Sequence, residues 1–416
     1  MRSTIDLLRS NYNVTNTSNQ NKYTNLDLEI NENEVLNNKK TRILEVSFYN
    51  PYSKKGAGVE NYVLKLKDFF EAEEFEVNFA YLASDEDKPH VERDGDIRVE
   101  SKFINAFPSL SRLSYNILLY LKLRKNSDRY EVIHINGDNG AMLSLLKNKF
   151  TVMTIHGSWI DSTLKTIKFS KFFNGIYWLA NSIILGGLEA LAVKKSKMVL
   201  SVSQQAALLF RRSKIKDPIL VIHPFIKDTS TNFENRDTVR EKFQLKNEEL
   251  LCLWVGKDPI RKGLSTAIEA VLKTSSTRLI VVGSNINLKN DRIINLGVVD
   301  DDTLKDLYAA SDIFIFPSLS EGFSLAIVEA MAAGLVPLIR FDNPGTEAVQ
   351  HGYNGFVARN DQDFIDILKD IEAGNYDLGE LERNAILTSL DLKKEFNQQM
   401  HKIGEEIESV IRVKNK

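Results

Sequence analysis

The sequence predicts an α/β protein with two doubly wound parallel sheets. Short, nearly continuous apolar runs alternate with amphipathic segments, a pattern typical of buried parallel strands separated by helices. The pattern runs from Arg42 to about Pro224, stops at a polar stretch, and starts again at Leu250. A chain of 416 residues is also too long for one ordinary core. We therefore expect two Rossmann-like domains that face each other across a ligand cleft.

Both halves show the same order of elements. In the first half we expect strands in RILEVSF, FEVNFAYLA, VIHIN, TVMTIHG and MVLSVS, with helices from about Val59, over AMLSLLK and near Trp178. In the second half we expect strands in LLCLWVG, LIVVGS, IINLGVV, DIFIFPS and VPLIRF, with helices over STAIEAVLK, DDTLKDLYAAS and after Gly322. A last amphipathic helix, at about 392–411, closes the chain.

The same pattern sets the predicted domain limits. The N-terminal domain is expected at 41–226, the C-terminal domain at 227–390 and the closing helix at 391–416. Residues 1–40 are rich in Asn, Ser, Thr and charge, so we expect a disordered extension there.

Composition excludes several functional classes. Of the residues, 43% are hydrophobic and 26% are charged, which suits a globular protein with a substantial core. The formal net charge of −2 gives no reason to expect nucleic-acid binding. The single cysteine, Cys252, is expected to fill the core, and we expect a cytoplasmic protein because no signal sequence opens the chain. The apolar segment 176–192 is too short to span a bilayer and predicts a packed helix.

A basic loop follows the first strand of the second half. In VGKDPIRKGLSTAIEA the strand ends at Gly256, and Lys257, Arg261 and Lys262 precede a helix. Three cations at the carboxyl end of a strand, next to a helix N-terminus, form an anion site suited to phosphate. A solvated basic loop is the alternative that this stretch alone leaves open.

Two glutamates eight positions apart mark the stretch FPSLSEGFSLAIVEAMAAG. Glu321 lies in the turn after a strand, and Glu329 lies inside an apolar helix. A carboxylate buried there would lose its hydration unless it accepts hydrogen bonds, for example from the two hydroxyls of a ribose. A salt bridge or a helix-capping role is the alternative. The N-terminus of that helix also offers backbone N–H groups to an anion.

This stretch resembles the signature of the family 4 glycosyltransferases, retaining enzymes of the GT-B fold. The resemblance extends upstream through LGVVDDDTLKDLYAASDIFIFPS and downstream through NPGTEAVQHGYNGFV. In that family this module binds the nucleotide-sugar donor. The resemblance implies that Glu321 contacts hydroxyls of the donor sugar and that Glu329 binds the ribose. It also implies that backbone amides of Phe323, Ser324 and Leu325 contact the sugar and the distal phosphate.

The resemblance also assigns a role to the basic loop. The cationic pair of the family falls on Lys257 and Lys262, which would neutralise the diphosphate leaving group in place of a metal. Neither a metal nor another cofactor is therefore expected. Lysine at 257 replaces the usual arginine and lacks its two-pronged phosphate contact, so Arg261 is the candidate to compensate.

The N-terminal half resembles the family more loosely. In SFYNPYSKKGAGVENYVLKLKDFF, the resemblance implies that Gly56, Ala57 and Gly58 let the backbone approach the acceptor and the donor phosphate. A dehydrogenase fingerprint fails because the third glycine of GxGxxG would be residue 61, which is Asn61. TVMTIHG resembles the strand that ends in the family's histidine, so His156 would contact the transferred sugar or the acceptor hydroxyl.

Two further histidines receive no role in the site. His134, inside VIHIN, is open to interpretation as a satisfied core histidine. His223 stands where many relatives have a Pro-Asn-Gly turn, so the contacts of that turn are not carried over to it.

The resemblance predicts a metal-independent glycosyltransferase of the hexosyltransferase type. Its donor would be a nucleotide diphosphate sugar and its acceptor a glycan or lipid-linked molecule, in the synthesis of surface polysaccharide or glycoconjugate. The catalytic roles fall on His156, Glu321 and Lys262. A degenerate, non-catalytic family member that acts as an interaction subunit is the alternative. A hydrolase is disfavoured because no partner carboxylate is obvious in the N-terminal half.

Two stretches, 110–125 and 164–178, mix leucines, aromatic residues and cations. This composition suits a helix at a membrane surface, which would place the enzyme at the inner face of the membrane. It equally suits helices packed on the sheet with lysines at the rim. Peripheral membrane contact therefore stays an open alternative.

Overall fold

The computed structural model describes residues 40–53, 58–83, 94–100, 108–167, 172–216, 218–224, 236–245, 249–285, 290–341 and 344–414. Thr41–Lys416 forms one compact unit. The predicted extension, 1–40, lies outside the described residues except for its last residue, and so does most of the polar stretch between the two halves.

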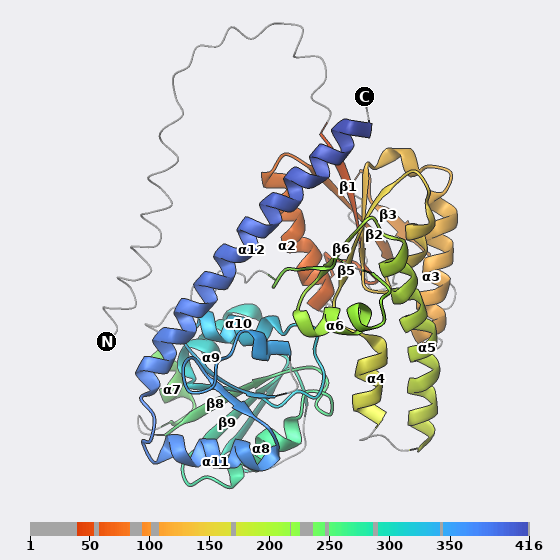
Figure 1. The fold of residues 1–416 in the computed structure, drawn as a ribbon. Coiled ribbons are helices and arrows are strands. Elements are labelled where there is room, and N and C mark those ends of the chain that lie inside the picture. The colour runs from red at the N-terminus through yellow and green to blue at the C-terminus, as the bar shows by residue number, and fades with distance from the viewer. Residues whose placement is uncertain are drawn as a thin grey trace, which may run out of the picture. The chain divides into compact units, whose positions relative to one another are not determined.

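The N-terminal half is built on a parallel sheet with the strand order β3-β2-β1-β4-β5-β6-β7 (Figure 1). The strands are β1 (Arg42–Val46), β2 (Glu76–Leu82), β3 (Ile97–Val99), β4 (Val132–Asn136), β5 (Phe150–Ile155), β6 (Met198–Ser201) and β7 (Leu220–Val221). The chain enters the sheet at β1, adds β2 and β3 on one side of it, and then adds β4 to β7 on the other side. This change of direction between β1 and β4 is typical of the doubly wound arrangement. The loops after these two strands therefore flank the expected ligand crevice.

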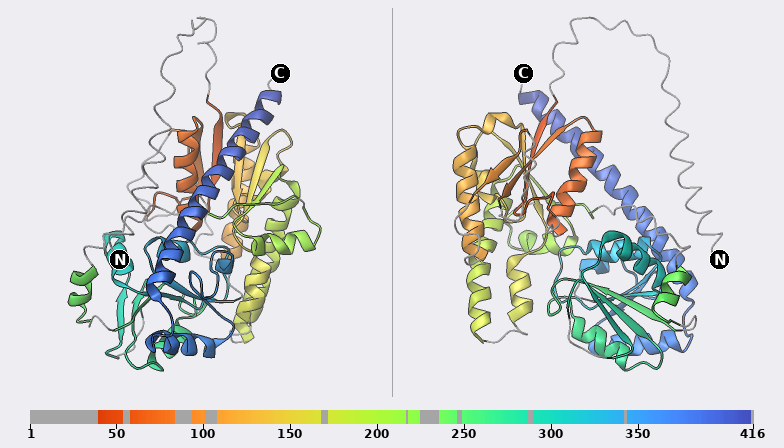
Figure 2. Two further views of the ribbon diagram at one scale, coloured as in Figure 1. Left: turned by 60° about the vertical axis from the view of Figure 1, so that its left-hand side comes forward. Right: turned by 180° about the vertical axis from the view of Figure 1, so that it is seen from behind.

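Helices cover both faces of this sheet (Figure 2). They are α2 (Gly58–Ala72), α3 (Pro108–Leu123), α4 (Trp159–Ile167), α5 (Phe172–Lys195) and α6 (Gln204–Arg212), with short 3₁₀ segments η1 (Ser127–Arg129) and η2 (Ala141–Leu145). Leu44 and Val46 of β1 join the cluster that contains side chains of α3 and α5, whereas Ile43 joins the cluster around α2. The helix expected over 141–147 is the 3₁₀ segment η2, which ends when Leu146 returns to extended backbone.

The C-terminal half repeats the architecture with the strand order β10-β9-β8-β11-β12-β13. The strands are β8 (Leu251–Val255), β9 (Arg278–Val282), β10 (Ile293–Gly297), β11 (Ile313–Phe316), β12 (Val336–Arg340) and β13 (Phe356–Ala358). The helices are α7 (Arg236–Lys242), α8 (Leu264–Leu272), α9 (Asp301–Ala310), α10 (Leu325–Ala332) and α11 (Asp361–Glu372), with the 3₁₀ segment η4 (Pro344–Glu347). The C-terminal half has two clusters of buried hydrophobic residues, and Cys252 is fully buried in one of them, as expected for a core residue.

A single long helix, α12 (Leu378–Lys414), links the two halves (Figure 1). The sequence-based start near 392 is wrong, because the helix begins directly after Asp377, whose carboxylate accepts the N–H of Glu380 at 3.1 Å. Its first part packs on the C-terminal half, where Leu381 and Ala385 are buried. Its last part packs beside α2 and β1 through apolar residues at a spacing of three and four: Phe396, Met400, Ile403, Ile407 and Ile411.

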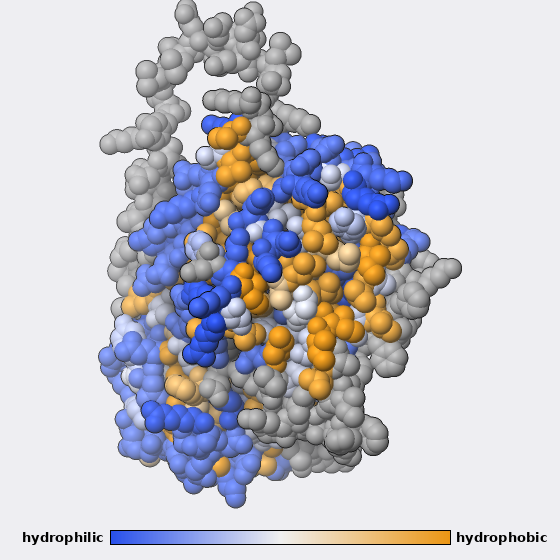
Figure 3. Space-filling view, turned by 45° about the vertical axis from the view of Figure 1, so that its right-hand side comes forward, coloured by the Kyte–Doolittle hydropathy of each residue, from blue (hydrophilic) through white to orange (hydrophobic). Residues whose placement is uncertain are grey.

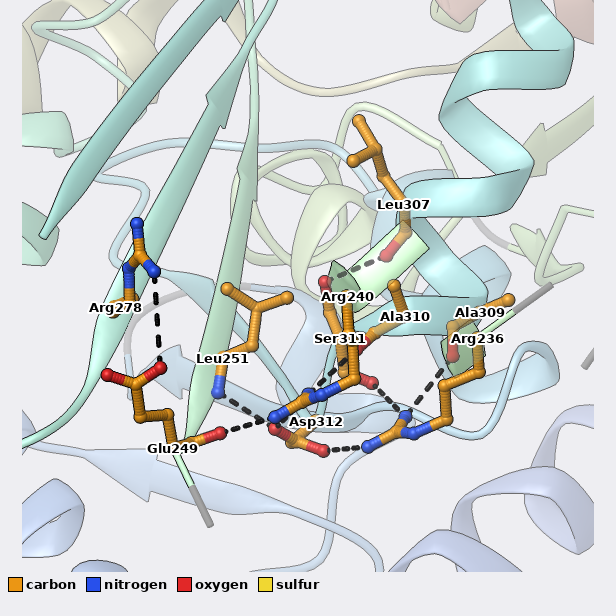
Figure 4. A network of polar contacts seen from close by, with 10 residues as sticks. All are labelled: Arg236, Arg240, Glu249, Leu251, Arg278, Leu307, Ala309, Ala310, Ser311 and Asp312. Atoms are coloured by element: carbon orange, nitrogen blue, oxygen red, sulfur yellow. Dashed lines mark hydrogen bonds and ion pairs between the residues drawn. The ribbon is translucent and has the colours of Figure 1, made fainter. Parts of the chain in front are cut away.

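A buried charge network anchors α7 to the amino-terminal end of the C-terminal sheet (Figure 4). Asp312, next to the start of β11, accepts the N–H of Leu251 at 2.8 Å and pairs with Arg236 and Arg240. Arg240 also donates to the carbonyl oxygen of Glu249 at 2.6 Å. Because ligands bind at the opposite, carboxyl ends of parallel strands, this network has a structural role.

Among the helices within the described ranges, none is both long enough and apolar enough to cross a membrane. The segment 176–192 lies inside α5, as expected for a packed helix.

Candidate functional site

Loops from the carboxyl ends of both sheets meet at Gly322. A Cβ atom on Gly322 would lie 1.6 Å from the carbonyl oxygen of His156, so only glycine fits between the loops. Ser203, which caps α6, donates its hydroxyl to the carbonyl oxygen of Gly322 at 2.8 Å. His156 and Ser203 follow β5 and β6, whereas Gly322 follows β11. The contact therefore joins the strand ends of the two sheets, where α/β sheets bind ligands.

Glu321 lies at the centre of a charged cluster beside this contact. Its Oε1 lies 2.7 Å from Lys262 Nζ and 3.1 Å from Arg261 Nη1, and it accepts a hydrogen bond from Ser318 Oγ at 2.7 Å. Burial alone would raise the pKa of Glu321, but Lys262 and Arg261 hold that pKa below its ordinary value. Glu321 is therefore a carboxylate at neutral pH, and two cations balance its charge.

The three predicted cations differ in exposure. Lys262 exposes 16% of its side chain, Arg261 exposes 32%, and Lys257 is exposed. Burial lowers the pKa of Lys262, and Glu321 opposes that shift. The ammonium group of Lys262 also lies 4.6 Å from the centre of the Phe316 ring. The structure thus gathers Arg261 and Lys262 at Glu321 and leaves Lys257 at the exposed start of the loop.

Backbone geometry holds the basic loop against the turn that carries Glu321. Gly263 has a φ of +68°, and a Cβ atom there would lie 2.2 Å from the carbonyl oxygen of Pro317. The N–H of Leu319 donates to the carbonyl oxygen of Arg261 at 2.8 Å, and the indole of Trp254 donates to that of Lys262 at 3.1 Å. Since β8 and β11 are adjacent strands, these contacts fix the cations beside the carboxylate.

The helix α10 starts directly after this turn. Ser324 is its N-cap residue, but its side chain makes no capping hydrogen bond. Phe323 and Ser324 are buried, and Leu325 is half-buried. Backbone N–H groups at a helix N-terminus favour an anion, so the predicted role of these three residues fits their position.

Glu329 is half-buried, not buried as the apolar sequence around it suggested. Its side chain is 27% exposed, and its carboxylate lies 4.0 Å from Lys65 Nζ on α2. The apolar neighbours Val328, Ala330 and Met331 face the core instead, because adjacent helix positions point in different directions. Glu329 therefore forms an ion pair with Lys65 at the limit of contact distance. Its side chain is exposed enough for hydroxyl groups of a ligand to reach the carboxylate.

His156 lies directly after β5, at the carboxyl end of the N-terminal sheet. Its Nε2 is 2.9 Å from Asn136 Oδ1, and its ring meets the ring of Tyr62 edge-on, with 4.8 Å between centres. Burial and, to a lesser extent, His134 lower the pKa of His156 to about 3. The imidazole is therefore neutral at neutral pH. His134 is a core histidine that contacts Glu45 at 2.8 Å and Thr154 at 2.7 Å.

Glu347 is a residue of this region that the sequence did not reveal. Its carboxylate accepts the N–H groups of Gln204 and Gln205, at the start of α6, at 2.8 and 2.9 Å. His223 Nε2 lies 3.0 Å from the same carboxylate, and the His223 ring lies 5.1 Å from that of Phe323. Burial would raise the pKa of Glu347, but these hydrogen bonds lower it. Glu347 thus holds the two halves together beside the site.

Part of the predicted acceptor side lies outside the described residues, namely Gly56 and Ala57. Gly58 is the first residue of α2 and is exposed, and a Cβ atom added to it would meet nothing within 4 Å.

Comparison with known proteins agrees with this geometry. The family described as Glycosyltransferase Family 4 matches residues 56–229, and the family described as Glycosyl transferases group 1 matches residues 249–372. The first match spans α2 to the end of the N-terminal sheet, and the second spans β8 to α11. The chain belongs to the family 4 glycosyltransferases. Its two facing doubly wound sheets form the GT-B fold.

Three proteins of known sequence or structure illustrate what this glycosyltransferase is similar to. An uncharacterised glycosyltransferase of Methanocaldococcus jannaschii is 25% identical over 55% of this chain and 62% of its own length, so the match spans less than two thirds of that relative. The alpha-monoglucosyldiacylglycerol synthase of Acholeplasma laidlawii is 24% identical over 82% of this chain and 90% of its own length. Anabaena HepE, solved with UDP and glucose, superimposes with a TM-score of 0.65 at 20% identity, over 88% of this chain and 100% of its own.

Proposed function

We propose that this protein transfers a sugar, with retention of configuration, from a nucleotide diphosphate sugar to a glycan or lipid-linked acceptor. The observation that carries the proposal is the cluster of Glu321, Lys262 and Arg261 beside the N-terminus of α10. A largely buried carboxylate, two cations and a helix N-terminus at one strand edge suit a ligand that bears both hydroxyls and a diphosphate. The fold relative HepE is recorded with UDP and glucose, which supports this donor class.

The donor would lie along the loops after β8 and β11. Glu321 would accept hydrogen bonds from sugar hydroxyls, and Glu329 from the ribose. Lys262 and Arg261 would stabilise the charge that develops on the leaving diphosphate, with Lys257 nearer the surface, so we propose a metal-independent reaction. Binding would redistribute existing charge pairs, because the phosphates must share the two cations that now balance Glu321.

The acceptor would approach from the N-terminal sheet, beside His156 and the loop before α2. For the retaining reaction we propose departure and attack on the same face, with the leaving phosphate helping to remove the acceptor proton. Two buried carboxylates near this edge are already committed to other partners. Glu45 binds His134 and Asn136, and Asp138 binds Arg112 and Trp159. This favours a mechanism without a carboxylate nucleophile.

We also propose that the acceptor is reached at the inner, anionic surface of a membrane. The outer face of α3 carries exposed apolar residues at one-face spacing, Leu110, Ile117, Leu118 and Leu121, and α5 adds Leu179 and Ile183. Figure 3 shows hydrophobic residues gathered on the side of the molecule that carries α3 and α5. The exposed cations Lys122, Arg124 and Lys125 at the end of α3 complement anionic lipid. In the stretch 164–178 the side chains lie outside the described residues.

Vesicle binding tests the membrane part of the proposal. The wild-type protein is expected to co-sediment with vesicles that contain anionic lipid at low salt, and Leu118→Glu is expected to abolish most of this binding. Leu208→Glu is the matched control, because Leu208 is equally exposed, at 39% against 38% for Leu118, but lies on α6. If the wild-type protein ignores such vesicles, or if both variants bind alike, the membrane proposal is abandoned.

A nucleotide-sugar panel tests the transferase proposal. Each donor is assayed for thermal protection and for slow hydrolysis, with and without exhaustive chelation of metal ions. We expect protection by a small set of donors and undiminished turnover after chelation. An absolute metal requirement would contradict the metal-independent reaction, and protection by none of the donors would favour the non-catalytic alternative.

A further inference from the structure

A buried polar network lies beneath the imidazole of His156. Its members come from β1, β4, β5 and α2, and each side chain is at least 95% buried: Glu45, Asn136, Thr154, His134 and Tyr62. Buried polar groups are costly unless every donor and acceptor finds a partner, so the network restricts the orientation of each member. Two strand positions in the sequence signal it, since Glu45 and His134 interrupt otherwise apolar runs.

The amide of Asn136 can take only one orientation. Its Nδ2 lies 3.2 Å from Glu45 Oε2 and 3.2 Å from the carbonyl oxygen of Val46, and both of these atoms are acceptors. The reversed amide would place Oδ1 against two acceptors and lose both bonds. Asn136 Oδ1 therefore faces His156 Nε2 at 2.9 Å. Because that oxygen can only accept, Nε2 must carry the proton.

The rest of the network fixes the position of these groups. Glu45 Oε1 lies 2.8 Å from His134 Nδ1, and His134 Nε2 lies 2.7 Å from Thr154 Oγ1. The hydroxyl of Tyr62 bonds to Thr154, and the Tyr62 ring packs edge-on against His156. The imidazole is therefore held at Nε2 and along one side of its ring. Within the described part of the chain, the hydrogen bond of the His156 ring is the one at Nε2, and the residue is partly exposed.

We infer that Asn136 and Glu45 are positioning residues that hold His156 as the Nε2–H tautomer, so that Nδ1 accepts a hydrogen bond from a substrate hydroxyl. The imidazole then cannot donate a proton at the site, because its single N–H is bound to Asn136. Such an acceptor selects ligands that bear a hydroxyl at this point over their deoxy analogues. The identity of that hydroxyl, on the donor sugar or on the acceptor, rests on the proposed function, whereas the tautomer does not.

Side-chain ¹⁵N NMR of the ligand-free protein tests the tautomer directly. The sequence has only six histidines, and the loss of one set of signals in His156→Gln assigns the resonance. We expect the Nε2–H tautomer in the wild-type protein. In Asn136→Ala we expect a mixture of tautomers. The opposite tautomer in the wild-type protein, or an unchanged one in Asn136→Ala, would overturn the inference.

Asn116→Ala is the control for general damage. Asn116 is as buried as Asn136 and bonds the carbonyl oxygens of Arg112 and Asp138, each at 2.9 Å, but it does not touch His156. The His156 signals should not change in this variant. If Asn136→Ala fails to fold, Glu45→Gln serves instead: it removes the charge that orients the Asn136 amide, so we expect part of the His156 signal to shift to the other tautomer. An unchanged signal in Glu45→Gln would then overturn the inference.

Kinetics identify the source of the hydroxyl. Deoxy donors and deoxy acceptors are compared with their parents in the wild-type protein and in Asn136→Ala. In the wild-type protein, one deoxy position is expected to lower kcat/KM by up to about tenfold, the value of one hydrogen bond. In Asn136→Ala that penalty should largely disappear. A penalty that persists unchanged would contradict the role of Asn136. If no donor supports sugar transfer, the proposed function is contradicted, whereas the NMR result still stands.

Discussion

The carboxyl edges of the two sheets are built from opposite kinds of polar group. The C-terminal edge carries ionised side chains, with Glu321 balanced by Lys262 and Arg261. The N-terminal edge presents a neutral imidazole, His156, held by a buried network that includes Asn136. A charged edge suits the diphosphate of a donor, and a neutral edge with a fixed lone pair suits hydroxyls. The difference teaches how the proposed reaction would divide its work, with charge stabilisation in one half and hydroxyl positioning in the other.

The largest expected effect comes from removing a cation of the charged edge. Lys262→Ala should lower kcat/KM by about 10²–10³-fold, the usual loss when one preorganised charge-stabilising group is deleted. The affinity for the donor, measured by titration, should fall in parallel. Lys273→Ala is the matched control, because Lys273 is an exposed lysine at the far end of α8. Unchanged donor affinity and turnover in Lys262→Ala would show that the charged edge does not bind the diphosphate.

The next effect concerns the point where the two edges touch. Gly322→Ala should lower turnover by about 10²-fold, since its Cβ must push the loop of His156 away and misplace one edge relative to the other. Gly187→Ala is the control, because a Cβ atom there meets nothing within 4 Å. The two variants are compared by steady-state kinetics and by their melting temperatures. Equal turnover in both would mean that the two edges need not approach so closely.

The free energy of unfolding should depend on pH differently through His156 at one edge and Glu321 at the other. The pKa of His156 is lowered from 6.5 to about 3, so its contribution to stability is complete above pH 6.5 and is lost as the pH falls toward 3. The pKa of Glu321 is lowered from 4.5, so its contribution is complete above that pH and is lost only in stronger acid. Between pH 6.5 and 5, the wild-type protein should therefore lose up to about 1.4 kcal/mol per pH unit relative to His156→Gln.

Urea unfolding of the wild-type protein, His156→Gln and Glu321→Gln at a series of pH values measures these slopes. Over the same range Glu321→Gln should follow the wild-type slope, since both still contain His156. A wild-type slope equal to that of His156→Gln would disprove the low pKa of the imidazole.

The smallest effect compares two buried tyrosine hydroxyls, one near each edge. The hydroxyl of Tyr62 bonds to Thr154, so Tyr62→Phe should destabilise the protein by about 1 kcal/mol. The hydroxyl of Tyr308, near Glu329, is buried and has no partner among the described residues. Tyr308→Phe should therefore be neutral or stabilising by up to about 1 kcal/mol. Denaturant midpoints check both values. A clear loss of stability in Tyr308→Phe would show that the Tyr308 hydroxyl does make a hydrogen bond.

Most of the fold and part of the site were predictable from sequence. Each expected strand is present. Buried parallel strands are continuous apolar runs, so they can be recognised in a sequence without knowing their position in the sheet. The predicted start of α12 was too late because Ser389, a buried polar residue, interrupts the apolar spacing that would otherwise lead from Leu392 back to Leu381. The burial of Glu329 was also overestimated, because sequence neighbours in a helix do not share a face.

By itself, the sequence determined the two doubly wound halves and the residue types of the charged edge, because both depend on patterns within a few residues. Only the tertiary structure decided that Lys262 and Arg261 pair with Glu321, about 60 residues away in the chain. It alone placed Glu45 against His134 and Asn136, which are 89 and 91 positions further along the chain. Such contacts depend on the order in which strands join a sheet, and no local pattern encodes that order.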